Sequence, residues 1–247
     1  MSGRNASVAV AGAGDFIGSA ICKRFAAEGY QVHGGRRQGE KLATLSREIV
    51  SAGGSFTGHT LDVRSEESVT AFLDAANASA PLEVCVFNIG ANVNFPIVDT
   101  TERVFRKVWE MACYGGFLTG REAARRMLVY GRGSIFFTGA TASLRGGKGY
   151  AAFASAKSGL RAVSQSMARE LGPKNIHVAH LIIDAGVDTA WVRERIASVR
   201  GAEAAANLPP DTLMNPASVA ETYWHLHCQS RDAWTHELDL RPYGETW

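Results

Sequence analysis

The sequence predicts one α/β domain in which helices cover both faces of a parallel sheet. Short apolar runs rich in Val, Ile and Ala recur along the chain, and longer amphipathic stretches separate them. The apolar runs are continuous rather than alternating, which favours strands that are buried on both faces. A glycine-rich loop follows the first apolar run and precedes a helix-like stretch, as in doubly wound sheets.

The elements follow one another as strand and helix. The strands are expected at the apolar runs, residues 7–11, 30–33, 55–61, 82–88, 134–138 and 177–183, with an alternating edge strand at 234–240. The helices are expected at the amphipathic stretches, residues 20–27, 41–52, 66–76, 101–130 (one long helix or two in series), 151–171 and 191–199. Gly53-Gly54 and Gly172-Pro173 are typical of helix ends.

The chain length suits a single core. Its 247 residues are 46% hydrophobic and show no repeat, linker or low-complexity stretch, so we expect one domain over residues 1–247. Residues 190–215 form a less regular, alanine-rich region after a late strand. This covering segment (residues 190–215) is expected to cover a substrate site, and plain surface helices are the alternative.

Composition excludes several classes of function. A net charge of +2 without a long basic cluster argues against nucleic-acid binding, and no apolar run is long enough to cross a bilayer. The N-terminus leads into a strand rather than a secretory signal. The four cysteines are scattered, without metal-ligand spacing, so we expect reduced thiols, no metal and a cytoplasmic protein. Cys85, in an apolar run, is expected to be a core thiol.

The glycine loop (residues 12–18) has the features of a dinucleotide-binding turn. Gly12, Gly14 and Gly18 permit a tight turn and a close approach of the backbone to a pyrophosphate, which the following helix N-terminus then faces. Phe16 and Ile17 belong to the same loop, and Phe16 adds bulk near the expected cofactor. The alternative is a tight turn that binds nothing.

Two arginines indicate which nucleotide is bound. Arg36 and Arg37 follow the second strand, where an acidic residue would bind the ribose 2′-hydroxyl of NAD. Guanidinium groups suit the 2′-phosphate of NADP, so NADP(H) is favoured over NAD(H). The alternative is a pair of solvated surface arginines. Asp15 opposes the prediction slightly, because a carboxylate in the loop would repel phosphate.

The glycine loop, Phe87-Asn88-Ile89-Gly90 and Lys157 in its helix together resemble the short-chain dehydrogenase/reductase family. The resemblance extends to about Thr189 and implies a Rossmann-type fold. The loop departs from the family pattern Thr-Gly-x-x-x-Gly-x-Gly at Ala11 and Phe16. The resemblance implies further cofactor contacts at Asp62, Val63, Asn88, Gly90, Lys157 and Thr189.

The catalytic signature of that family is Tyr-x-x-x-Lys, in which the tyrosine exchanges a proton with the substrate while hydride moves to or from nicotinamide. Lys157 matches the lysine, but Phe153 occupies the tyrosine position and cannot donate a proton. Ala140 falls at the serine position and Ala112 at the asparagine position. The resemblance therefore implies a cofactor site without the usual proton donor.

Several residues are candidates to replace the donor. Tyr150, Phe153 and Lys157 share one helical face if the helix begins by residue 150; the alternative is that Tyr150 packs in the preceding loop. Thr138 lies on the same side of its strand as Ala140, two residues later. Tyr114 and Asp184 are further candidates.

These observations lead to three hypotheses. The first is an NADP(H)-dependent oxidoreductase that acts on a C=O, C=C or C=N bond of a small molecule. The second is an inactive NADP-binding sensor or partner subunit, and the third a non-redox lyase or isomerase. The resemblance also implies a homodimer or homotetramer that pairs through the helices at 101–130 and 151–171.

Overall fold

Seven parallel strands form one sheet in the computed structural model, which describes residues 4–245. The sheet order is β3-β2-β1-β4-β5-β6-β7. The strands are β1 (Ser7–Ala11), β2 (Gln31–Arg36), β3 (Ser55–Thr60), β4 (Leu82–Phe87), β5 (Gly133–Thr138), β6 (Ile176–Ile183) and β7 (Glu237–Leu240). The direction of winding reverses between β1 and β4, so the predicted doubly wound, Rossmann-type sheet is confirmed.

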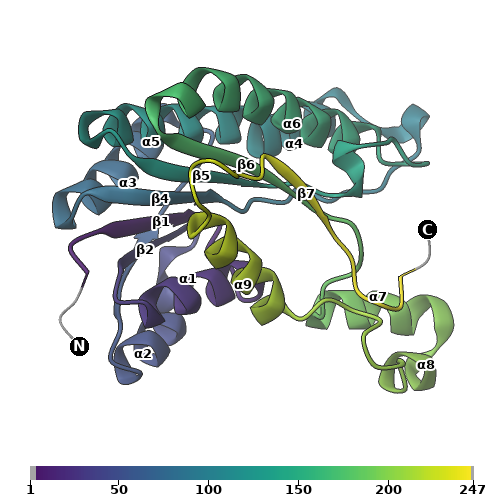
Figure 1. Ribbon diagram of the computed structural model, residues 1–247. Coiled ribbons are helices and arrows are strands. Elements are labelled where there is room, and N and C mark those ends of the chain that lie inside the picture. The colour runs from purple at the N-terminus through teal and green to yellow at the C-terminus, as the bar shows by residue number, and fades with distance from the viewer. Residues whose placement is uncertain (1–3, 246–247) are drawn as a thin grey trace.

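Helices cover both faces of this sheet (Figure 1). One face carries α1 (Ile17–Ala27), α2 (Ala43–Ser51) and α9 (Pro216–His227). The opposite face carries α3 (Glu66–Ser79), α4 (Glu102–Trp109), α5 (Gly115–Tyr130) and α6 (Ala151–Leu171). Two further helices, α7 (Ala190–Arg200) and α8 (Ala202–Ala206), lie beyond the end of α9 in this view.

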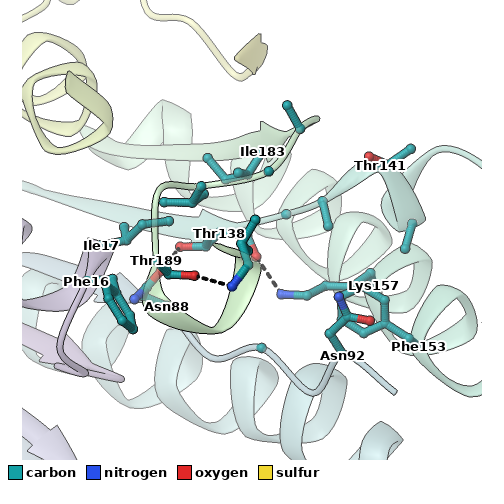
Figure 2. A pocket seen from close by; sticks show the side chains of 18 of the residues that line it. Phe16, Ile17, Asn88, Asn92, Thr138, Thr141, Phe153, Lys157, Ile183 and Thr189 are labelled. Carbon is teal, nitrogen blue, oxygen red and sulfur yellow. Dashed lines mark hydrogen bonds between the residues drawn. The ribbon is translucent and has the colours of Figure 1, made fainter. Parts of the chain in front are cut away.

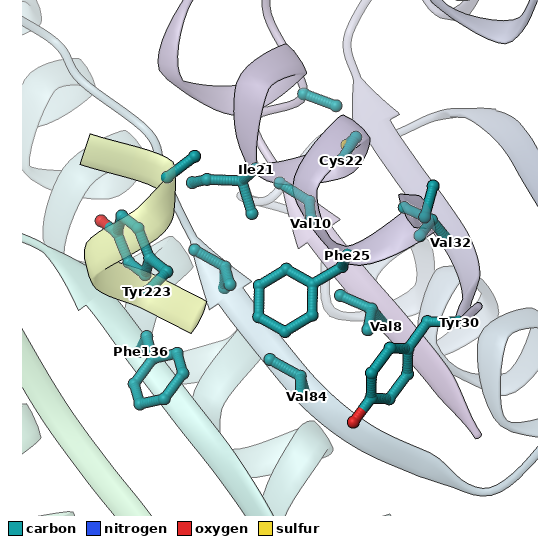
Figure 3. Close-up of a cluster of buried hydrophobic side chains, with 14 of the residues drawn as sticks. Val8, Val10, Ile21, Cys22, Phe25, Tyr30, Val32, Val84, Phe136 and Tyr223 are labelled. Atoms are coloured by element: carbon teal, nitrogen blue, oxygen red, sulfur yellow. The ribbon is translucent and has the colours of Figure 1, made fainter. Parts of the chain in front are cut away.

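Strand β1 shows why the apolar runs do not alternate. All five of its residues are buried. Val8 and Val10 belong to the core on the α1 and α9 side, where Figure 3 shows them beside Phe25. Ala9 and Ala11 belong to the core on the α3 and α5 side. Successive side chains point to opposite faces, and both faces are covered, so each position favours an apolar residue.

Strand β2 extends to Arg36, beyond the predicted end at residue 33. The prediction stops early because Gly34 and Gly35 follow, and glycine is rare in strands. Its hydrogen-bonded register continues through Gly34, Gly35 and Arg36. A Cβ atom at Gly34 would lie 2.6 Å from the Phe56 ring, and one at Gly35 would lie 2.5 Å from Leu61. Neighbouring side chains therefore fill the space that the glycines leave.

The stretch predicted as one long helix or two in series is two helices, α4 and α5. A π-helical turn, Glu110–Tyr114, joins them. The predicted edge strand at 234–240 is shortened to β7, because the residues before it make other contacts. Trp234 stacks on His177, and the Thr235 backbone N–H donates to the side chain of Gln229.

Two predictions from composition can be compared with the structure. Cys85 is a buried core thiol, as expected, and burial raises its pKa to about 12. Among residues 4–245, no helix is long and apolar enough to span a bilayer.

Candidate functional site

A cavity of about 880 Å³ lies at the carboxyl ends of the central strands (Figure 2). The glycine loop lines one end of it, and residues from the start of α6 and from α7 line the other. Asn88 and Thr138, from the ends of β4 and β5, line it between them. This is the switch point of the sheet, where doubly wound domains bind their ligands.

The glycine loop requires glycine at two of its three glycine positions. A Cβ atom on Gly12, whose φ is +95°, would lie 2.4 Å from the Asn88 carbonyl oxygen. A Cβ atom on Gly18 would lie 2.1 Å from the Gly12 carbonyl oxygen. A Cβ atom on Gly14 would meet nothing within 4 Å, so the backbone at Gly14 stays open to a ligand.

The approach to the α1 N-terminus suits an anion. No acidic residue lies in the first turn of α1. Phe16, directly before the helix, lines the cavity with Ile17 and is 38% exposed. The open backbone at Gly14 and the helix N-terminus would therefore suit a pyrophosphate.

The two arginines of the predicted phosphate site differ in their contacts. Arg36, at the end of β2, forms a 2.9 Å ion pair with Asp15. Arg37 is exposed beside it. The ion pair neutralises the carboxylate of Asp15. From the sequence alone, this carboxylate is expected only to repel a phosphate.

Asp62 and Val63 follow β3. Arg64 donates two hydrogen bonds to the Asp62 carboxylate, at 2.9 and 2.6 Å, and holds the pKa of that carboxyl below its usual range. Val63 is buried and touches Gly115 at the start of α5. Contact of either residue with a cofactor stays a prediction.

Lys157 is buried beneath the cavity. Its Nζ donates to the Thr138 carbonyl at 2.7 Å and to the Ile89 carbonyl at 3.0 Å. Burial lowers the pKa of Lys157 to about 7. The ammonium lies 5.9 Å from the centroid of the Phe153 ring. The lysine is thus held against two strand ends, with an apolar ring beside it.

Three residues in or near the cavity have apolar side chains. Phe153 and Ala140 both line the cavity. Ala112, in the π-helical turn, is buried in the same apolar cluster as Phe153. None of these three side chains can donate or accept a proton.

Tyr150 precedes α6 rather than belonging to it, since the helix begins at Ala151. Its side chain still lines the cavity, and its hydroxyl accepts a 3.2 Å hydrogen bond from Arg195. Tyr150 and Lys157 therefore line the same cavity. They do not share a helical face, because Tyr150 lies before the helix.

The Thr138 hydroxyl is already bonded. It donates to the Asn88 side-chain oxygen at 3.1 Å and shares a 2.6 Å hydrogen bond with the buried Tyr223 hydroxyl. The same Asn88 side chain donates to the Gly12 carbonyl. This chain of contacts ties β5 to β4 and to the glycine loop.

The other two candidate donors lie apart from the cavity lining. Tyr114 stacks between Trp109 and Phe117. Asp184 is buried, pairs with Arg241 and accepts a hydrogen bond from Thr141. An ion-paired carboxylate favours a structural role for Asp184.

Thr189 and Gly90 line the cavity at positions that the sequence indicated. The Thr189 side chain caps α7 by accepting a 3.0 Å hydrogen bond from the Val192 backbone. The cap fixes the start of α7, so Trp191 and Val192 of the covering segment also line the cavity.

Sequence reasoning missed Asn92. Its side chain lines the cavity, and Figure 2 shows it pointing toward the region of Phe153. Within residues 4–245 its amide has no hydrogen-bond partner, so it is available to a ligand. The available signal was its place two residues after Gly90, in the loop that leaves the ligand-binding end of β4.

No group of three or more metal-ligating side chains occurs within the described part of the chain.

Comparisons with known proteins agree with this geometry. A family model described as short chain dehydrogenase matches residues 6–199. The 3-oxoacyl-[acyl-carrier-protein] reductase MabA of Mycobacterium tuberculosis is 30% identical over 218 residues, which are 87% of this chain and 82% of that protein. The uncharacterized oxidoreductase YuxG of Bacillus subtilis is 32% identical over 205 residues, 79% of this chain but only 30% of that longer protein.

Solved structures are similar over almost the whole chain. A short-chain dehydrogenase from Rhodopseudomonas palustris is 60% identical, with a TM-score of 0.84 over 97% of this chain and 100% of that one. A single-residue variant of the actinorhodin polyketide ketoreductase, solved with NADPH, is 25% identical, with a TM-score of 0.87 over 98% of each chain.

Proposed function

Because the chain belongs to the short-chain dehydrogenase family, we propose that it is an NADP(H)-dependent oxidoreductase whose site works without the usual tyrosine. One observation carries the proposal. Lys157 is held by the Thr138 carbonyl at the end of β5 and the Ile89 carbonyl just after β4, in a cavity that the glycine loop also lines, and Phe153 lies beside the lysine. This arrangement would bind the cofactor but has no proton donor at position 153.

The residues present suit NADP(H). The glycine loop and the start of α1 would hold the pyrophosphate, and Arg37 with Arg36 would hold the 2′-phosphate. Asn88, Gly90, Lys157 and Thr189 would hold the nicotinamide half. Bound NADPH supplies the hydride. The actinorhodin ketoreductase, a structural neighbour, is described with NADPH, which supports this preference.

The substrate follows from the missing acid. Reduction of a ketone needs a proton on the developing alkoxide, and losing a positioned acid costs about 10²- to 10⁴-fold in rate. Hydride addition to a polarised C=C bond instead gives a delocalised anion, which hydrogen-bond donors can stabilise and which water can protonate. The Asn92 amide and the Tyr150 hydroxyl both line the cavity and are the donors we assign to this task.

A substrate panel tests the proposal. NADPH oxidation is followed with matched ketones, enones and imines, using the wild type and the Tyr150→Phe and Asn92→Ala variants. We expect turnover of the enones above that of the ketones, and a loss of about tenfold or more in at least one variant. Faster ketone turnover, or turnover that neither variant changes, would contradict these assignments.

A second function is favoured by the same three side chains. Because Phe153, Ala140 and Ala112 cannot transfer a proton, the chain would bind NADP without reacting and act as a sensor or a partner subunit. Tight NADPH binding without turnover of any substrate in the panel would favour this function over the first.

A further inference from the structure

The end of the cavity opposite the glycine loop carries two arginines. Arg145 belongs to the loop after β5, and Arg195 lies on α7. Both side chains are exposed and line the cavity. Over residues 4–245, neither guanidinium forms an ion pair with a carboxylate. The other arginine of α7 near this site, Arg193, is by contrast paired with Asp188 at 2.5 Å.

Contacts within the protein orient Arg195 and place the loop of Arg145 beside Tyr150. The Arg195 guanidinium lies 5.6 Å from the Trp191 ring centroid and donates to the Tyr150 hydroxyl at 3.2 Å. A Cβ atom on Gly147, two residues after Arg145, would lie 3.2 Å from the Tyr150 ring. The loop that carries Arg145 therefore approaches the Tyr150 ring at Gly147, and Arg195 reaches the Tyr150 hydroxyl from α7. Stacking on Trp191 limits the freedom of Arg195.

Among residues 4–245, no carboxylate that lines this end of the cavity compensates the positive charge. Of the described residues that line the cavity, Asp15 is the one with a carboxylate, and it lies in the glycine loop paired with Arg36. Asp184 is buried nearby but is already paired with Arg241. The substrate end thus combines two uncompensated guanidinium groups with the apolar side chains of Phe153, Trp191 and Val192.

We infer that this end of the cavity binds a small molecule that joins an apolar body to an oxyanion, a carboxylate or a phosphate, held by Arg145 and Arg195. Guanidinium groups bind both oxyanions through paired N–H donors. The identification of that molecule as the hydride acceptor rests on the proposed function. In this assignment the two arginines determine specificity, and the apolar side chains hold the body of the substrate against the cofactor.

Binding can be tested separately from turnover. The probe is 4-oxo-4-phenylbutanoate, which lacks a reducible C=C bond, titrated calorimetrically with and without NADP⁺. Its methyl ester is the neutral match, and 3-oxo-3-phenylpropylphosphonate distinguishes phosphate-like from carboxylate binding. We expect at least one anion to bind about tenfold or more tightly than the ester, with an affinity that falls as salt rises.

Variants then locate the anion. Arg145→Gln and Arg195→Gln should each weaken anion binding by about fivefold, which corresponds to about 1 kcal/mol, and leave ester binding unchanged. Arg200→Gln is the matched control, because Arg200 is also exposed on α7 but does not line the cavity. Anions that bind no better than the ester, or no binding of any probe, would overturn the inference, as would equal losses in Arg200→Gln. Anion selectivity that persists without NADPH binding would support the inference and reject the proposed function.

Discussion

At the scale of single residues, Lys157 and Phe153 define the site. Two backbone carbonyls hold the Lys157 ammonium, and in the proposed function this lysine orients the cofactor. The neighbouring ring gives that ammonium no partner that can transfer a proton. In the proposed function, the two residues separate cofactor binding from proton transfer, because Phe153 carries no hydroxyl.

Phe153→Tyr should restore that coupling. The new hydroxyl would lie on a cavity-lining ring near Lys157, so carbonyl reduction should rise about 10²-fold or more. The measurement is NADPH oxidation with a small β-keto ester, and Phe153→Leu serves as the control without a hydroxyl. An equal rate in both variants would contradict the prediction and mean that Phe153 alone does not limit carbonyl reduction.

Asp15→Asn should strengthen NADPH binding. The substitution removes a negative charge from the glycine loop and frees Arg36 from its 2.9 Å ion pair. Because both effects favour a phosphate, we expect the NADPH dissociation constant to fall by about three- to tenfold, and less at high salt. Asp99→Asn removes an exposed carboxylate that does not line the cavity. If it has the same effect, net charge rather than Asp15 is responsible.

At the scale of elements, polar side chains form hydrogen bonds that connect neighbouring strands. His180 of β6 lies under Gly139, directly after β5, and its ring bonds to Glu237 of β7 at 3.0 Å. Ser143 lies 3.3 Å from the other ring nitrogen. These contacts support the floor of the cavity, so its shape depends on polar residues outside its lining.

Gly139→Ala should therefore destabilise the protein. A Cβ atom at Gly139 would lie 2.4 Å from the His180 ring, which its partners hold in place. We expect a loss of about 1–3 kcal/mol in the free energy of unfolding, measured by urea denaturation. Gly146→Ala, where a Cβ atom would meet nothing within 4 Å, should change stability by less than about 1 kcal/mol. Equal losses would contradict the account of this contact.

A second polar contact predicts how stability depends on pH. His33 of β2 bonds to His59 of β3 at 2.9 Å and to Ser79 of α3 at 2.8 Å, and burial lowers its pKa to about 4. The folded state therefore stays neutral at His33 while the unfolded chain takes up a proton below its ordinary pKa of about 6.5. The free energy of unfolding should therefore be highest above pH ~6.5 and should decrease as the pH falls toward 4.

The expected loss from His33 is about 3 kcal/mol by the time the pH falls below 4, of which about 2 kcal/mol lies between pH 7 and pH 5. Buried His180, whose pKa is also lowered to about 4, adds a loss in the same range of pH. The measurement is urea denaturation of the wild type and of His33→Asn at pH 7 and pH 5. The variant should show a smaller difference between the two pH values, and an unchanged difference would refute the assignment.

At the scale of the whole molecule, the sheet and its winding follow from local patterns in the sequence. Continuous apolar strands such as β1 reveal burial on both faces, and the glycine loop and Lys157 were identified from their neighbours along the chain. Asn92, Arg145 and Arg195 were not identified, since they come from loops and a late helix that only folding brings together. The ion pair between Asp15 and Arg36 was missed for the same reason.

Self-association also belongs to this scale. Phe105 and Trp109 are exposed on α4 and Phe117 on α5, in the region expected to pair two copies of the chain. We predict a homodimer or homotetramer by light scattering at micromolar concentration, and a smaller species for Trp109→Glu. Val199→Glu, on exposed α7, is the control. A wild-type monomer would contradict the prediction.

Calorimetric titration with NADPH and NADH tests the central claim most directly, because the claim is that the cofactor site persists without the catalytic tyrosine. We predict saturable binding of NADPH, at least tenfold tighter than that of NADH, and loss of this preference when Arg36 and Arg37 are both replaced by Gln. No binding of either nucleotide by the folded protein would contradict the account and would mean that Phe16 closes the glycine loop.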